Sequence, residues 1–290
     1  MEASRPELRL EAESRAQAEA WSLVLAAEGV PHALLASEGR FAVAIDVAFG
    51  ARAEALIASW TRENEPPARA APEAEPDLPT NAGIWIGLAL AAFFAVTGPW
   101  SETSPWFERG TADARRIVNG ELWRSVTALT LHSDAAHVLG NAFSCGVFGT
   151  LLLRRWGVGV GAWILLGSGT LGNLATAFWH GSQHRSVGAS TALFGAIGAL
   201  AATELVRRRR ERLGWNRAWL PLAGGMGLLA MLGTGAGSDL TAHGLGLLAG
   251  AALGLLSARA ISERPPAAAQ AALSFGAIGA IALAWFAALA

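Results

Sequence analysis

Hydrophobic residues are distributed unevenly along the chain, and long apolar runs fill most of its second part. Several of these runs approach or exceed the roughly 18 to 20 residues that cross a bilayer as a helix. We predict seven such segments, at residues 82–98, 134–153, 158–179, 188–206, 217–233, 240–257 and 268–290. The pattern predicts a polytopic all-α membrane protein.

The first 65 residues have a mixed pattern that is typical of a small soluble module. Apolar and polar positions alternate where strands are expected and recur at helical spacing where helices are expected. We predict a strand, a helix, two strands and a helix, at residues 8–13, 14–28, 32–37, 41–46 and 51–60. This α+β module is βαββα-like, and no partner for it follows from its sequence.

Changes in composition predict the boundaries between domains. Residues 66–80 are rich in Pro, Ala and Glu without periodicity, as in a flexible linker. The linker follows the soluble module at 1–65 and precedes a six-helix core at 81–257 and an additional C-terminal helix at 258–290. Within the core, the interval 99–133 is rich in Trp, Pro and charge, which predicts a structured loop at the membrane face.

Composition excludes several classes of protein. Apolar residues make up 52% of the chain and charged residues 16%, with a mean hydropathy of +0.36, so a purely soluble enzyme is excluded. The net charge of -1 gives no electrostatic reason to expect a nucleic acid as partner. No H-E-x-x-H motif occurs, and His132 and His137 are five residues apart, so they do not share a helix face. We therefore expect no metal and no other cofactor.

The distribution of arginine predicts the orientation in the membrane. Ten arginines lie in the connections after the second, fourth and sixth apolar segments, and five lie on the opposite side. Because positively charged loops stay in the cytoplasm, we expect the N-terminus inside and, after seven spans, the C-terminus outside. Every basic residue is Arg and Ala and Gly are abundant, which is typical of GC-rich bacterial genes and favours a bacterial inner membrane.

Few strongly polar residues lie within the apolar segments, and such residues are functional candidates because they are costly in a bilayer. His137 and Asn141 lie four apart in the second segment, Ser190 opens the fourth, and His243 lies early in the sixth. The expected topology puts all four in the outer part of the membrane, where they can converge. A Ser and a His supply a nucleophile and a base, and a His/Asn pair supplies donors for an oxyanion.

Each of these residues also has a structural interpretation. A lone Ser in a membrane helix usually bonds to its own backbone, and Asn141 is equally suited to contact between helices. An intramembrane His is also typical of a proton relay in a transporter. His180 and His184 are interpreted as exposed loop histidines, and Asp239, four residues before His243, as a loop or cap residue.

Three motifs in this sequence resemble those of the rhomboid family of intramembrane serine proteases. They are Glu121-Leu122-Trp123-Arg124 with His132, His137 and Asn141; Gly188-Ala189-Ser190; and Ala242-His243 with Gly246 and Gly250. The motifs occur in the family's order and at matching membrane positions. The resemblance covers about residues 82–257, and the seventh segment is similar to the extra C-terminal helix of the 6+1 members.

The resemblance implies a rhomboid-like core that cleaves a peptide bond in or near the transmembrane segment of other membrane proteins. Ser190 would be the nucleophile and His243 the general base, without the third carboxylate of soluble serine proteases. His137, Asn141 and the backbone N–H of Ser190 would form the oxyanion hole. The implied partners are therefore transmembrane substrates and the lipid bilayer.

Further motif residues are expected to support the site: Phe194, Gly188, Gly246, Gly250, Trp123 and Arg124. Phe194 matches a family position whose ring packs against the catalytic His, although an ordinary core or lipid-facing ring fits it nearly as well. The two later glycines share a helix face with His243, which allows the fourth and sixth segments to approach closely. Trp123 and Arg124 are assigned to stabilising the interfacial loop, with a membrane-interface aromatic as the alternative for Trp123.

One residue departs from the family pattern, and two other functions compete. Thr191 follows Ser190 where the family commonly has Gly, and a branched side chain there is expected to narrow the site or alter substrate choice.

A catalytically silent rhomboid-like protein that binds client helices would usually lack Ser or His of the pair. A transporter would be expected to show an internal repeat or a broken helix pair, and neither is convincing here.

Overall fold

The computed structural model describes residues 7–37, 40–64, 77–181, 183–211, 223–224 and 239–290. The chain divides into two compact units, Met1–Pro72 and Glu73–Ala290, each of which is described by itself. Almost all of the predicted apolar segment 217–233, and most of the predicted linker, lie outside the described residues.

The N-terminal unit is a small α+β module. Its elements are β1 (Glu7–Ala12), α1 (Arg15–Ala27), β2 (His32–Ser37), β3 (Arg40–Asp46), a 3-10 turn η1 (Val47–Phe49) and α2 (Gly50–Asn64). The strands form an antiparallel sheet in the order β1-β3-β2. Val43 and Ile45 of the central strand pack with Leu25 of α1 and Ile57 of α2. The predicted order of elements is confirmed.

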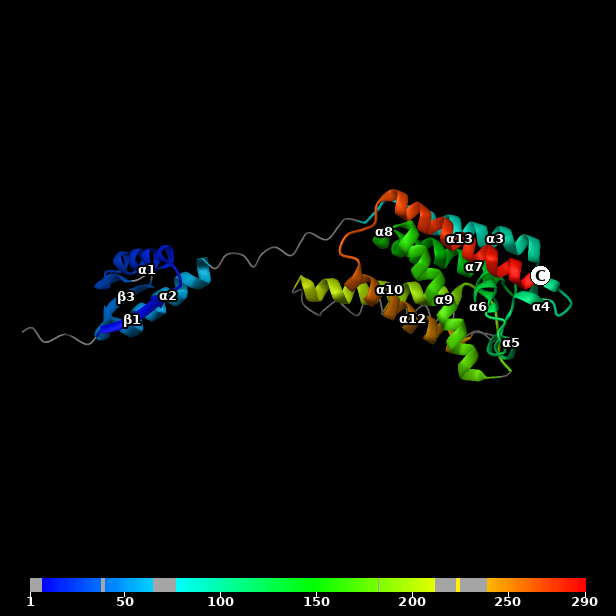
Figure 1. Ribbon diagram of the computed structural model, residues 1–290, viewed down its shortest axis with the longest axis horizontal. Helices are drawn as coiled ribbons and strands as arrows, with labels where there is room; N and C mark the ends of the chain where they lie inside the picture. Colours follow the sequence, from blue (N-terminus) through cyan, green and yellow to red (C-terminus); the bar gives the residue numbers. More distant parts are fainter. Residues whose placement is uncertain (1–6, 38–39, 65–76, 182, 212–222, 225–238) are drawn as a thin grey trace, which may run out of the picture. The chain divides into compact units, whose positions relative to one another are not determined.

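The second unit is a bundle of apolar helices (Figure 1). Its long helical segments are α3 (Ala82–Thr97), α7 (Ala135–Ser144) continued by the π-helical turn η3 (Cys145–Gly149) and α8 (Thr150–Trp156), α9 (Val158–His180), α10 (Ser190–Arg210), α12 (Leu240–Ala260) and α13 (Ala267–Leu289). Four of them are long and apolar enough to cross a membrane, at Ala135–Trp156, Val158–His180, Leu240–Ala260 and Ala267–Leu289. The predicted all-α polytopic architecture is confirmed.

Helices α10 and α12 approach each other at positions that lack side chains, and α9 packs against both (Figure 1). A Cβ atom at Gly250 would overlap the backbone carbonyl of Gly195, and one at Gly198 would overlap the carbonyl of Leu247. A Cβ atom at Gly246 would likewise overlap the carbonyl of Thr191. The close approach that the glycine spacing predicted is therefore present.

The interval between α3 and α7 is structured, as its composition predicted. It contains α4 (Pro105–Gly110), β4 (Ala112–Asp113), α5 (Ala114–Val118), α6 (Arg124–Thr127) and the 3-10 turn η2 (Ala128–Thr130). The two-residue strand β4 pairs with β5 (Arg185–Ser186), which lies between α9 and α10. This pairing joins two loops that are about 70 residues apart in the sequence.

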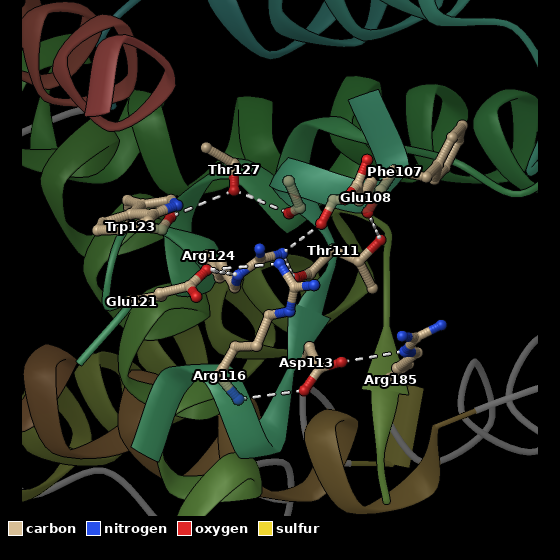
Figure 2. A network of polar contacts seen from close by, with 11 residues as sticks. Phe107, Glu108, Thr111, Asp113, Arg116, Glu121, Trp123, Arg124, Thr127 and Arg185 are labelled. Atoms are coloured by element: carbon tan, nitrogen blue, oxygen red, sulfur yellow. Dashed lines mark hydrogen bonds and ion pairs between the residues drawn. The ribbon is translucent and has the colours of Figure 1, made fainter. Parts of the chain in front are cut away.

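Arg124 is the centre of the polar network in this interval (Figure 2). Its side chain is 2% exposed, and its Nε donates a hydrogen bond to Glu121 Oε2 at 2.6 Å. Its Nη1 donates to the carbonyls of Glu108 and Thr111 at 2.9 and 3.2 Å. One buried guanidinium therefore ties α6 to the end of α4, and the Thr127 hydroxyl adds a 2.8 Å bond to the Gly110 carbonyl.

The C-terminal helix α13 is fastened to α9 by a buried amide. Gln270 Oε1 accepts hydrogen bonds from the N–H groups of Gly159 and Val160 at 2.7 and 3.1 Å. Its Nε2 donates to the carbonyl of Trp156 at 3.0 Å. One side chain thus satisfies backbone groups at the end of α8 and at the start of α9, where helix termini leave N–H and C=O groups without intrahelical partners.

Candidate active site

The structure brings together the Ser and the His that the sequence singled out. Ser190 is the first residue of α10, and His243 lies in the first turn of α12. The distance from Ser190 Oγ to His243 Nε2 is 2.8 Å, although the residues are 53 positions apart. His243 is 6% exposed. A hydroxyl this close to a ring nitrogen can transfer its proton to that nitrogen as it attacks.

His243 is held on its other side by an aromatic ring and not by a carboxylate. The rings of Phe194 and His243 stack with centroids 4.6 Å apart, in the arrangement expected for Phe194. Within the described part of the chain, His243 Nδ1 makes no hydrogen bond. Asp239 instead accepts a bond from the Ala242 N–H at 2.9 Å and so caps α12, as predicted. The geometry is that of a pair rather than a triad.

A glycine turn before Ser190 leaves room for two polar side chains. Gly188 has φ 119°, a conformation that favours glycine, and its N–H donates to the carbonyl of Ala128 at 2.9 Å. A Cβ atom at this position would lie 2.6 Å from His137 Nε2 and 3.4 Å from Asn141 Nδ2. Both predicted oxyanion residues therefore converge on the backbone two residues before Ser190.

The two side chains differ as hydrogen-bond donors. Asn141 is 6% exposed, and its Nδ2 has no partner among the residues that the structure describes. His137 Nδ1 lies 3.0 Å from Ser133 Oγ, and that hydroxyl donates to Asp134 at 2.8 Å. The ring hydrogen of neutral His137 is therefore on Nδ1, so that its Nε2 donates only when the ring is doubly protonated. Asn141 donates in every state.

The methyl group of Thr191 packs against neighbouring helices. The residue is 2% exposed. Its Cγ2 lies 2.6 Å from where a Cβ atom at Gly172 would be, and 2.9 Å from where one at Gly246 would be. The methyl group therefore fills space between α9 and α12 that two glycines leave open. We expected this side chain to narrow the site or alter substrate choice. The structure gives its methyl group a packing role between α9 and α12, and an effect on substrate choice stays a prediction.

The interpretation of His184 as an exposed loop residue was wrong. Its Nε2 lies 2.6 Å from Asp239 Oδ2, and its side chain is 23% exposed. His180, at the end of α9, is exposed and stacks on His184 with ring centroids 4.3 Å apart. Sequence reasoning missed this contact because the residues are 55 positions apart and neither belongs to a motif.

His132, to which the sequence assigned no role in the site, also contacts the turn before Ser190. It is fully buried, and its Nε2 accepts a 3.4 Å hydrogen bond from the N–H of Ala189. Trp123 and Arg124 lie in the loop network and not beside Ser190, as their assignment to the loop predicted.

These features define a polytopic helical membrane protein in which Ser and His meet at the ends of two adjacent helices. A family model described as the Rhomboid domain matches residues 119–260. The chain belongs to the rhomboid family.

Curated relatives agree with this assignment. The chain is similar to the rhomboid protease GluP of Bacillus subtilis (strain 168), with 31% identity over 64% of this chain and 37% of that protein. It is 32% identical to the putative rhomboid protease YdcA of the same organism, over 45% of this chain and 61% of that protein. It is 34% identical to rhomboid-like protease 1 of Toxoplasma gondii, over 51% of this chain and 52% of that protein. The matches thus span between about one third and three fifths of these relatives.

Proposed function

We propose that this protein is an intramembrane serine endopeptidase that uses Ser190 as nucleophile and His243 as general base. The observation that carries the proposal is the 2.8 Å contact between Ser190 Oγ and His243 Nε2. The names of the relatives, which are mostly rhomboid proteases, support the same reaction class. Substrates would be membrane proteins cut in or near a transmembrane segment, at a site with small and helix-weakening residues.

The proposed reaction begins when Ser190 Oγ attacks the scissile carbonyl carbon and its proton passes to His243 Nε2. The carbonyl π electrons move to the oxygen, which becomes an oxyanion. Asn141 Nδ2 and the Ser190 N–H are the donors for that oxyanion, since Asn141 has no competing partner among the described residues and the first amides of a helix have no intrahelical acceptor. His243 then gives its proton to the leaving amine, and water releases the acyl group by the reverse transfers.

We further infer the orientation and domain plan from the sequence. The N-terminal module at 1–65 would lie in the cytoplasm, joined by the linker at 66–80 to the protease core at 81–257, with the helix of 258–290 ending outside. Under this topology, the starts of α10 and α12 face the outer side, where water can reach Ser190.

The test is cleavage of a reporter transmembrane substrate in liposomes by the wild type, Ser190→Ala and Ser274→Ala. Ser274 is a matched control because its hydroxyl bonds to the Gln270 carbonyl of its own helix. We expect Ser190→Ala to lose nearly all turnover and Ser274→Ala to retain it. Full activity in Ser190→Ala would overturn the mechanism.

A second assay separates the protease from a silent relative that only binds client helices. A fluorophosphonate should label Ser190 in the wild type, and the label should be lost in His243→Ala because the hydroxyl then has no base. If the wild type binds a transmembrane helix but neither labels nor cleaves, client binding replaces the protease proposal.

A further inference from the structure

A contact outside the reactive pair joins the two segments that carry its members. His184 precedes Ser190 by six residues, and Asp239 precedes His243 by four. His184 Nε2 and Asp239 Oδ2 are 2.6 Å apart. The distance is short for an N···O hydrogen bond, as expected when the acceptor is charged. The contact therefore links the same two chain segments as the 2.8 Å bond between Ser190 and His243.

Asp239 connects His184 to the first turn of α12, because it also binds two backbone N–H groups of that turn. Its second carboxylate oxygen accepts from the N–H of Ala242 at 2.9 Å, and its backbone carbonyl accepts from the N–H of His243 at 3.0 Å. A shift of Asp239 would therefore move the turn that carries the His243 ring. Because a misplacement of about 1 Å can cost on the order of 100-fold in rate, a small movement there would be measurable.

His184 is itself anchored on the side away from Asp239. Its carbonyl accepts from the N–H of Ala114 at 2.9 Å, and the next residue, Arg185, forms a 3.0 Å ion pair with Asp113 across the β4–β5 ladder. Figure 2 shows this ion pair at the edge of the Arg124 network. His184 thus transmits the position of the structured loop to α12.

We propose that His184 and Asp239 are positioning residues for the reactive pair. Their contact fastens the segment before Ser190 to the first turn of the helix that carries His243. The inference rests on the proposed function, since positioning matters only if the pair reacts.

The contact depends on pH. The hydrogen bond to Asp239 raises the pKa of His184 above its ordinary value of about 6.5. Burial raises the pKa of Asp239, but the hydrogen bonds from His184 and from the Ala242 N–H outweigh it and lower that pKa below its ordinary value. The other titratable and charged groups described around His184 are His180 on α9 and the Asp113–Arg185 pair.

The sign of the dependence follows from these directions. A raised His pKa means that the contact contributes fully below about pH 6.5 and weakens as the pH rises through the pKa of folded His184. A lowered Asp pKa means that the contact is kept down to about pH 4 and lost only in stronger acid. The contact should therefore be strongest between about pH 4 and 6.5.

The experiment measures fluorophosphonate labelling of Ser190 and cleavage of the reporter substrate by the full chain in liposomes, from pH 5.5 to 9. His184→Gln is compared with Gln183→Ala, a substitution at the exposed residue before it. We expect the wild type to label about 3- to 10-fold faster than His184→Gln at pH 6, with the ratio falling at alkaline pH. The change should appear in kcat rather than in KM, and Gln183→Ala should match the wild type throughout.

Two more variants test the pair itself. Asp239→Asn can still cap α12 but lacks the charge, so it should be at least as slow as His184→Gln, and the double variant should be no slower than Asp239→Asn alone. His184→Lys keeps a positive charge at high pH and should retain its rate where the wild type declines. A wild type to His184→Gln ratio that does not vary with pH, or additive effects in the double variant, would overturn the positioning role.

Failure of the proposed function gives a different result. If the wild type neither labels nor cleaves at any pH, the protease proposal fails and the positioning role falls with it. If the wild type labels and Ser190→Ala does not, the proposed function stands, and the pH ratio alone decides the role of His184 and Asp239.

Discussion

Two regions of the membrane unit are held together by opposite means. The α10–α12 interface is formed where side chains are missing, so that backbone meets backbone at Gly195 and Gly250. The loops beside it are joined by polar side chains, with Arg124 buried among carbonyl oxygens. An interface packed on backbone has no flexible group to move aside, whereas a polar network can lose one bond at a graded cost. Added volume should therefore be the greater threat to the site.

The sharpest test of this difference is Gly250→Ala. Its Cβ atom would overlap the Gly195 carbonyl, so we expect α10 and α12 to separate, labelling of Ser190 to be lost, and the thermal unfolding temperature to fall sharply. The cost should be at least the roughly 1 to 3 kcal/mol usual for overpacking. Gly244→Ala is the matched control on the same helix, since a Cβ atom there meets nothing within 4 Å. Equal unfolding temperatures for the two variants would refute the backbone-contact description.

Among the polar side chains, the substitutions with the largest expected effect are those of the oxyanion donors, and they should change the rate of turnover. Asn141→Ala should slow turnover by roughly 100- to 1,000-fold with little change in unfolding temperature, because it removes one oxyanion donor. His137→Ala should cost less than Asn141→Ala wherever the His137 ring is neutral, since the neutral ring holds its hydrogen on the nitrogen that faces Ser133. Single-turnover cleavage at several pH values measures both. Equal losses at every pH would contradict the difference between the donors.

Arg124→Gln should have the next largest effect, a loss of stability in the structured loop. The variant keeps a polar group but loses the ion pair with Glu121 and the bonds to the Glu108 and Thr111 carbonyls, so we expect a loss of about 3 kcal/mol in stability. Thermal unfolding monitored by circular dichroism gives the shift. Arg115→Gln, at an exposed position of α5, serves as the control. A shift no larger than that of the control would mean that the network does not stabilise the loop.

The smallest effect should come from Thr191→Gly. The change removes the methyl group packed against Gly172 and Gly246 and adds a glycine to a helix, so we expect a loss of about 1 to 2 kcal/mol in stability. The labelling rate of Ser190 well below the unfolding temperature should not rise. A clear increase in that rate would show that Thr191 obstructs the site after all.

Hydrophobic patterning and motif order predicted the helices, the βαββα order and the convergence of Ser190 with His243. These features follow from local periodicity and from a topology that puts alternate helix starts on one side. The two-residue strands of the β4–β5 pair are too short to leave a periodic pattern, and they form only because two loops meet. The segment predicted at 188–206 was expected to end before Arg207, but α10 continues through Arg207–Arg210. Ion pairs of Arg207 with Glu204 and Glu211 support this charged last turn, and a hydropathy pattern does not register them.

The features of the site that could not be predicted from the sequence depend on the directions of side chains. Whether Thr191 faces the site or a neighbouring helix is decided by the glycine opposite it at position 172, which lies on a different helix. The pairing of His184 with Asp239 likewise joins two positions that no spacing rule connects. The donor state of His137 is set by the second bond of the Ser133 hydroxyl.

The amide of Gln270 has a consequence for how the chain is made. Gly159 receives its acceptor from a residue 111 positions later, so the start of α9 stays uncapped while the intervening chain is translated. At roughly 5 to 20 residues per second, that delay is about 5 to 20 s. During this time a nascent protein could have most of its helices inserted and still lack the cap that fastens α9. Completion of the bundle is thereby coupled to the arrival of α13 from the ribosome.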